Sequence, residues 1–212
     1  MDLHTILKDW IVPIATASAA TIGSFVALVG LSSWRRQLHG QSDHELARRI
    51  LVALFKMRDA IQDVRNPALF SSEMPDPPAE KRETMSAEQI RFFGTSQAYE
   101  RRWEKVGRLQ TELYADIVEA EALWGAESKG LLDAIYGLNT ELRQNVVDYL
   151  TLQNPEVDER RKNVISNVRK HKRDILYSGP GMDSDNDQFA EDYEAAIRRV
   201  ESYLMPKLGR KK

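Results

Sequence analysis

The chain has 212 residues, 29% of them charged, yet 30 Lys and Arg against 32 Asp and Glu leave a net charge of only −2. This balance does not indicate a uniformly basic nucleic-acid binder, and the absence of Cys excludes disulfides, thiolate metal sites and cysteine nucleophiles. The length fits one ordinary domain plus an anchor. The mean hydropathy of −0.49 is that of a soluble protein, so any membrane-spanning segment is limited to one part of the chain.

That segment runs from Trp10 to Trp34 and predicts a membrane-spanning helix. Its 23 inner residues contain no Asp, Glu, Lys or Arg, and a helix of that length extends roughly 34 Å, enough for a hydrocarbon core of about 30 Å. Trp10 and Trp34 stand where interfacial aromatic residues are expected, and Arg35 and Arg36 follow directly. A cleaved signal peptide and a buried helix of a soluble protein are the alternatives.

The basic residues around this segment predict its orientation. Lys8 is the only Lys or Arg before it, whereas Arg35, Arg36, Arg48 and Arg49 follow it. This bias places the short N-terminus outside and the rest of the chain in the cytoplasm. We therefore expect a single-pass protein of the cell inner membrane, with the lipid bilayer as its first partner.

Small residues recur at four-residue spacing within the segment, at Ala15, Ala19, Gly23 and Ala27. Such a stripe lets a second helix approach closely in lipid, so it predicts helix association and a homo-oligomer. A single span that does not associate also tolerates Ala and Gly, which explains the small-residue stripe equally well.

After the anchor and its flanks (1–40), the sequence predicts an all-α fold, an antiparallel bundle of four to five helices. We divide it into a first bundle helix (41–66), a Pro-rich connector (67–95) and the remaining helices with a basic tail (96–212). No segment shows the alternation of a strand over any length.

The first bundle helix is expected to begin near Asp43, because Ser42 and Glu45 have the spacing of a capping box. Asn66-Pro67 is expected to end it, although the helix can also run on from the span. Its apolar residues recur at steps of three and four and form one seam: Leu46, Ile50, Leu54, Met57, Ile61 and Val64.

Within the connector, Pro75, Pro77 and Pro78 oppose regular structure. Its length suggests mobility or a loop with a function, against the simpler alternative of a tolerated surface loop. Ser86 and Gln89 predict a short capped turn that ends near Gly94.

Four further helices are expected, at 96–124, 127–153, 156–177 and 188–205. The first carries the apolar stripe Tyr99, Trp103, Val106, Leu109, Leu113, Ile117, Ala120 and Leu123, and Gly125 stops it. The next two carry Leu131, Ile135, Leu138, Leu142, Val146 and Tyr149, and then Val157, Val164, Ile165, Val168, Ile175 and Leu176. The last carries Phe189, Tyr193, Ile197, Val200 and Leu204, and Pro206 ends it.

Catalytic and metal motifs are not found in the sequence, and no cofactor is expected. No pair among the four His has the i, i+3 or i, i+4 spacing, together with carboxylates, that metal sites in bundles use. Asp183, Asp185 and Asp187 resemble the start of a calcium loop, with Glu194 at its twelfth position. Gln188 replaces the required Gly, however, so an acidic loop that caps the last helix is the alternative.

One cluster of basic residues is a candidate surface for anionic phospholipid. It comprises Arg160, Arg161, Lys162, Arg169, Lys170, Lys172 and Arg173. A nucleic-acid surface is disfavoured, because no aromatic residue interleaves the cluster. A solvated helix face, paired with nearby carboxylates, is the third interpretation.

Several short runs resemble a group of bacterial single-span proteins of no assigned function. They are ELARRIL from Glu45, KMRDAI from Lys56, VRNP from Val64, YxxRW from Tyr99, LWG from Leu123 and YLMP from Tyr203. The resemblance covers most of the chain after Trp34. It implies a bacterial inner-membrane setting and the same layout of anchor and helices, and it transfers no activity and no functional residue.

The sequence thus predicts a non-enzymatic, membrane-anchored helical protein that holds or senses an unidentified protein partner on the cytoplasmic face. The connector and the basic cluster are its expected contact surfaces. An oligomeric effector that perturbs the bilayer through the small-residue stripe is the alternative, and an enzyme with an unrecognised site is the third.

Overall fold

The structure, a computed structural model, describes residues 12–178 and 187–209, with side chains from Gly30 onward except at 32, 33, 35, 36, 38 and 39. The chain forms two compact units, Met1–Glu45 and Leu46–Lys212. The described residues form helices, turns and loops and include no strand, which confirms the all-α prediction.

Within the first unit the backbone is helical from Val12, as part of α2 (Val12–Arg65). Trp10 lies outside the described residues, as do the side chains of Ala15, Ala19, Gly23 and Ala27 and those of Arg35 and Arg36. Trp34 is 58% exposed.

Among the described residues, no helix is both long and apolar enough to cross a membrane.

The predicted helix start near Asp43 is wrong, because α2 continues through Ser42 and Glu45 without a break. Gly40 is the residue of lowest helix propensity between Trp34 and Leu46. A single Gly costs a helix about 1 kcal/mol relative to Ala, which is too little to end a helix of this length.

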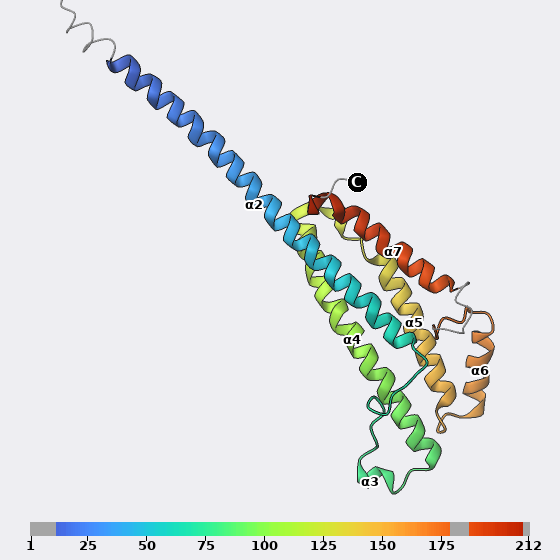
Figure 1. The fold of residues 1–212 in the computed structure, drawn as a ribbon. Coiled ribbons are helices and arrows are strands. Elements are labelled where there is room, and N and C mark those ends of the chain that lie inside the picture. Colours follow the sequence, from blue (N-terminus) through green and yellow to red (C-terminus); the bar gives the residue numbers. More distant parts are fainter. Residues whose placement is uncertain (1–11, 179–186, 210–212) are drawn as a thin grey trace, which may run out of the picture. The chain divides into compact units, whose positions relative to one another are not determined.

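Four helices of the second unit run up and down beside one another (Figure 1): α2 from Leu46, α4 (Ala87–Trp124), α5 (Asp133–Gln153) and α7 (Gln188–Leu204). Ion pairs show that α2 and α4 are antiparallel, since Arg49 contacts Asp116 while Asp63 contacts Lys105. The shorter elements are α3 (Ala79–Arg82), η2 (Ala126–Ser128), α6 (Glu159–Arg169) and η4 (Met205–Leu208). The predicted antiparallel bundle is therefore confirmed.

The core follows the predicted apolar seams. All six seam residues of α2 are buried, as are Phe189, Tyr193, Ile197, Val200 and Leu204 of α7. In α4 the stripe is buried from Val106 to Ala120, but Leu123 is half exposed. Every buried side chain in the described part of the chain lies at Leu46 or later, so the bundle has a core of its own.

The predicted turn that ends near Gly94 is wrong, and α4 begins at Ala87 rather than near Ser96. Its N-terminus has a capping box, in which the Ser86 hydroxyl accepts the Gln89 N–H and the Gln89 carboxamide accepts the Ser86 N–H. Gly94 does not interrupt the helix. A Cβ there would lie 3.2 Å from the Cβ of Met74, so the glycine admits the connector to close contact with α4.

Two other predicted boundaries are also corrected. Helix α5 begins at Asp133 rather than Glu127, because the chain first turns at Gly125, whose φ of 91° suits only glycine. Helix α6 ends at Arg169 rather than Tyr177. Beyond it, Ile175 and Leu176 enter the core from a non-helical segment.

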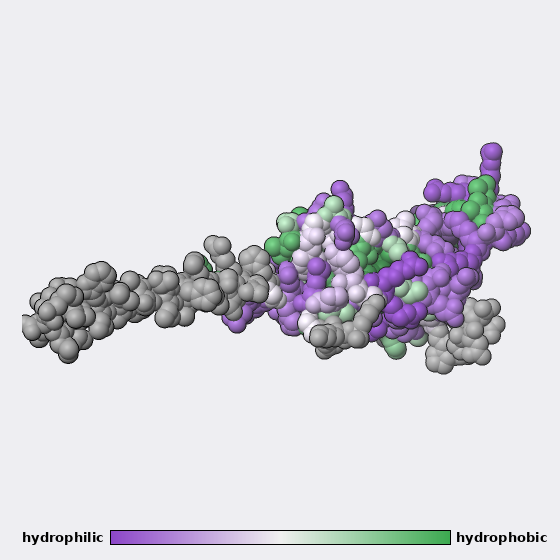
Figure 2. Space-filling view, turned by 90° about the horizontal axis from the view of Figure 1, so that it is seen from above, coloured by the Kyte–Doolittle hydropathy of each residue, from purple (hydrophilic) through white to green (hydrophobic). Residues whose placement is uncertain are grey.

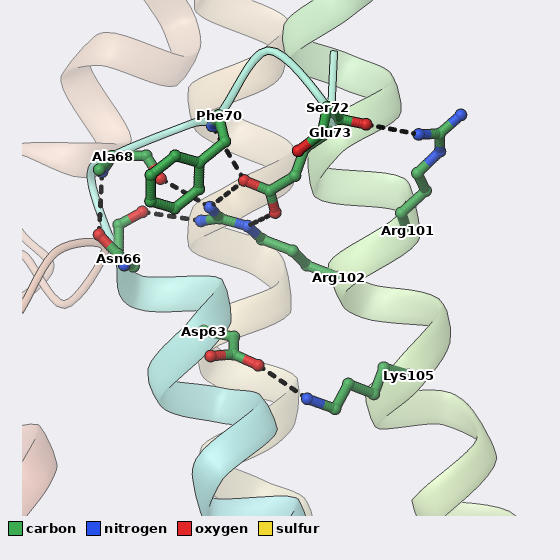
Figure 3. A network of polar contacts seen from close by, with 9 residues as sticks. All are labelled: Asp63, Asn66, Ala68, Phe70, Ser72, Glu73, Arg101, Arg102 and Lys105. Atoms are coloured by element: carbon green, nitrogen blue, oxygen red, sulfur yellow. Dashed lines mark hydrogen bonds and ion pairs between the residues drawn. The ribbon is translucent and has the colours of Figure 1, made fainter. Parts of the chain in front are cut away.

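The connector between α2 and α4 is fixed by one buried arginine of α4 (Figure 3). The Arg102 guanidinium donates to both carboxylate oxygens of Glu73, each at 2.7 Å, and to the carbonyls of Asn66 and Ala68, at 2.8 and 2.7 Å. These bonds lower the pKa of the Glu73 carboxyl below its usual value. The connector is thus tied to the bundle rather than being a free loop.

Candidate functional site: the outer face of α6

Helix α6 is a short helix that packs against α5 (Figure 1) and buries none of its side chains. Asp158 caps its N-terminus by accepting the Arg161 N–H at 2.9 Å. Glu159 in the first turn and Arg169 in the last turn suit the helix dipole. The cap and the terminal charges therefore stabilise α6 as a helix. Contacts made by the segment that follows it hold α6 in place.

That segment is held to the bundle by basic residues of the predicted cluster. Arg173 donates two hydrogen bonds of 2.7 Å to Glu141 of α5 and one of 2.6 Å to Asp192 of α7. The bonds to Glu141 raise the pKa of the Arg173 guanidinium and lower that of the Glu141 carboxyl. The ammonium of Lys172 lies 3.4 Å from Asp148. Arg173 and Lys172 thus form ion pairs with three carboxylates of the bundle, those of Glu141, Asp192 and Asp148.

Two further members of the cluster have acidic neighbours close in sequence. Arg169 lies 3.6 Å from Asp174, and Lys162 lies 3.5 Å from Glu159. Both basic side chains are less than a quarter exposed. Four residues of the cluster thus fit the interpretation of a helix face paired with nearby carboxylates: Lys162, Arg169, Lys172 and Arg173. Their positive charge is largely compensated within the protein.

The other three members of the cluster, Arg160, Arg161 and Lys170, are exposed. Neither Arg160 nor Arg161 has a carboxylate partner within the described parts of the chain, whereas the Lys170 ammonium donates to the Asn167 carboxamide oxygen at 3.3 Å. All three cations therefore lack a carboxylate partner among the described residues, and two of them, Arg160 and Arg161, lie together in the first turn of α6.

Two valines lie on the same side of α6 as these arginines. Val164 is 58% exposed and Val168 is 48% exposed. Residues four apart share a helix face, so Arg160, Val164 and Val168 form one line with Arg161 beside it. We call these four residues the outer face of α6. The sequence placed both valines on the buried side, but Ile165, Lys162 and Arg169 are the half-buried residues that face inward.

The described surface of the bundle in Figure 2 is mostly hydrophilic, with hydrophobic residues in separate patches. The remaining exposed apolar residues of the bundle include Val52, Phe70, Tyr114, Val118 and Val147, scattered over the connector and three helices. Scattered exposure of this kind is normal for a soluble domain. On the outer face of α6, two exposed valines lie beside two adjacent arginines without a carboxylate partner among the described residues, whereas on α5 the exposed Val147 lies four residues after a single such arginine, Arg143.

A cleft of about 450 Å³ lies between α2 and α7 and is lined by Arg58, Arg65, Tyr193 and Glu194, among others. Its arginines are already paired. Arg58 lies 3.8 Å from Glu194, and the buried Arg65 lies 2.9 Å from Asp187. The cleft therefore presents no uncompensated positive charge to an anionic ligand.

The predicted calcium loop lies mainly outside the described residues, which include neither Asp183 nor Asp185. Asp187 is described, and it pairs with Arg65 and caps α7 by accepting the Ala190 N–H at 3.1 Å. Its carboxylate thus has a role in the fold. No group of His, Asp and Glu within the described residues is placed to hold a metal ion.

Comparisons with family models, with curated proteins and with solved structures give no match to this chain. The resemblance to single-span inner-membrane proteins therefore remains a prediction.

Proposed function

We propose that this protein is a membrane-anchored, non-enzymatic interaction protein. The observation that carries the proposal is the uncharged segment between Trp10 and Trp34, 23 residues long and flanked by Arg35 and Arg36. A helical backbone from Val12 onward supports it, because a helix satisfies its own backbone hydrogen bonds in lipid. Roughly 34 Å of such a helix matches a hydrocarbon core of about 30 Å.

The proposed orientation places the N-terminus outside and the bundle in the cytoplasm, at the inner membrane of a bacterial cell. The excess of Lys and Arg after the segment supports this direction. The bundle would then be the part that meets a partner, since it has a hydrophobic core of its own.

Its proposed role is to hold or sense a protein partner beside the membrane. The charged surface of the helices and the tied connector support such a role, because interaction surfaces work best on rigid elements. Self-association through Ala15, Ala19, Gly23 and Ala27 is the alternative, in which the oligomer itself perturbs the bilayer.

The anchor is tested by alkaline extraction of membranes from cells that produce the full chain or residues 41–212. The proposal expects the full chain to stay in the membrane pellet and the shorter chain to be released. Release of the full chain would contradict it.

In-cell crosslinking of the full chain then separates the two roles. A crosslinked species that contains a different protein supports the partner, whereas a ladder of multiples of the chain that disappears in Gly23→Ile supports the oligomer. Turnover by the purified bundle in a broad hydrolase screen would contradict the non-enzymatic role.

A further inference from the structure

The outer face of α6 combines two features, exposed apolar surface and exposed arginines. Val164 and Val168 present apolar surface to solvent at four-residue spacing, and Arg160 and Arg161 beside them have no carboxylate partner among the described residues. Exposed valines alone would be unremarkable. Unpaired arginines alone would be an ordinary solvated face. Together on one face, the valines and arginines are complementary to a partner that is both anionic and apolar.

This face is presented on a fixed support. The inward side of α6 is half-buried, and the segment after it is bound to α5 and α7 through Lys172 and Arg173. The acidic residues nearest to the outer face are already engaged. Asp158 caps the helix, Glu159 lies by Lys162, and Glu156 accepts a hydrogen bond from the Gln89 carboxamide at 3.0 Å. Each of these carboxylates thus has another partner, and no ion pair within the described residues joins one of them to the side chain of Arg160 or Arg161.

We propose that the outer face of α6 binds the surface of an anionic phospholipid membrane. Arg160 and Arg161 would contact headgroup phosphates, and Val164 and Val168 would enter the boundary between headgroups and acyl chains. A nucleic-acid backbone offers phosphates but no apolar layer for the valines, and α6 carries no aromatic side chain on which a base could stack.

This inference rests on the proposed function only for its setting, because an anchored chain is held close to a membrane.

The chain contains no Cys, so a single introduced thiol can carry a fluorescent probe of polarity. We place it at Asn167→Cys, in the exposed last turn of α6, and at Thr111→Cys, an exposed position on α4, as the reference. The full-length protein is combined with vesicles of phosphatidylcholine alone, or of phosphatidylcholine with about a third phosphatidylglycerol. Emission wavelength and quenching by brominated acyl chains are measured.

The expected result is a blue shift and quenching at position 167 only with the anionic vesicles, reversed by high salt because screening weakens the headgroup contacts. The probe at position 111 should respond to neither vesicle. The double variant R160E/R161E should weaken the response at least about tenfold in lipid titration, since each cation near such a surface contributes substantially. V164T/V168T, which preserves side-chain shape, should reduce quenching by the acyl chains.

The matched control is R198E/R199E, which makes the same charge change at two adjacent exposed arginines of α7. It should retain the response at position 167. An equal loss in both double variants would overturn the inference, because the effect would then be one of net charge alone. Equal responses with the two vesicle compositions would also overturn it, as would a response to added RNA or to an acidic protein and not to lipid.

Failure of the anchor and failure of this inference are distinguishable in the same samples. Flotation of the full chain with phosphatidylcholine vesicles reports on the anchor. The dependence of the probe at position 167 on phosphatidylglycerol reports on α6, whether or not the chain is inserted.

Discussion

Replacing Arg102 by Leu tests whether one side chain fixes the connector to the bundle. Arg102 is 7% exposed and donates four hydrogen bonds, two to Glu73 and one each to the carbonyls of Asn66 and Ala68 (Figure 3). Leucine keeps the aliphatic volume near α4 but removes all four of these hydrogen bonds, so that Glu73 keeps only the bond that its Oε2 accepts from the Phe70 N–H at 3.0 Å.

The expected loss follows from the burial of the two charges. Removing one partner of a buried, hydrogen-bonded pair costs about 3–5 kcal/mol, because the other charge is left without a partner. The Glu73 side chain is 26% exposed, so water can reach its carboxylate after the substitution. We therefore expect the free energy of unfolding to fall by an amount at the low end of that range, about 3 kcal/mol.

Urea unfolding of residues 41–212 at pH 7 measures this loss, and Arg101→Leu is the matched control. Arg101 is the neighbouring residue, but it is exposed and makes a single hydrogen bond of 3.3 Å to the Ser72 carbonyl, so its replacement should cost less than about 0.5 kcal/mol. A loss below about 1 kcal/mol for Arg102→Leu, or equal losses in both variants, would refute the assignment of Arg102 as the residue that holds the connector.

The same pair predicts a dependence on pH. Hydrogen bonds from Arg102 lower the pKa of Glu73 in the folded protein below its usual value of 4.5. The stabilisation is therefore present above that value and is lost as the pH falls through the lower, folded pKa. The difference in unfolding free energy between the parent and Arg102→Leu should shrink on acidification, and a constant difference from pH 7 to pH 3 would contradict the pairing.

Three further outcomes follow from the structure. Leu113→Ala, at a fully buried position, should lower the free energy of unfolding by about 2–5 kcal/mol, whereas the Val164→Thr and Val168→Thr changes should each alter it by less than about 0.5 kcal/mol in the same urea titration. Gly125→Ala should cost about 1–3 kcal/mol, because φ is 91° there, and an unchanged thermal midpoint would contradict this. Arg65→Leu removes hydrogen bonds to two carbonyls of the non-helical segment after α6, so amide exchange in that segment should accelerate while exchange in the middle of α4 should not.

The helical seams were predictable because each follows from a local repeat. In α2 and α7 the apolar residues return every three or four positions, and all of those residues are buried. The helix ends were less predictable, because tertiary contacts decide them. Gly94 suggested a break on local propensity, but its missing side chain admits Met74 to close contact within a continuous helix. Nothing near Gly94 in the sequence indicates that Met74 packs there.

The candidate site shows the same limit. Sequence composition identified the basic cluster, but the partners of Arg173 and Lys172 are Glu141, Asp192 and Asp148, which lie on other helices. Only the tertiary structure separates these paired cations from the exposed Arg160 and Arg161. The apolar residues of this region also differ in their burial. Ile175 and Leu176 occupy the core from a non-helical segment, and Val164 and Val168 remain outside. Their exposure could not be read from helical periodicity, which groups all four together.

Membrane topology of the full chain tests the central claim most directly. Because the chain has no Cys, the variants Thr5→Cys and Thr111→Cys each carry one thiol, and a membrane-impermeant maleimide can be applied to spheroplasts before and after lysis. The account predicts that Thr5→Cys is labelled in intact spheroplasts and that Thr111→Cys is labelled only after lysis. Labelling of both positions only after lysis, or of Thr111→Cys alone in intact spheroplasts, would contradict a single span with the bundle on the cytoplasmic side.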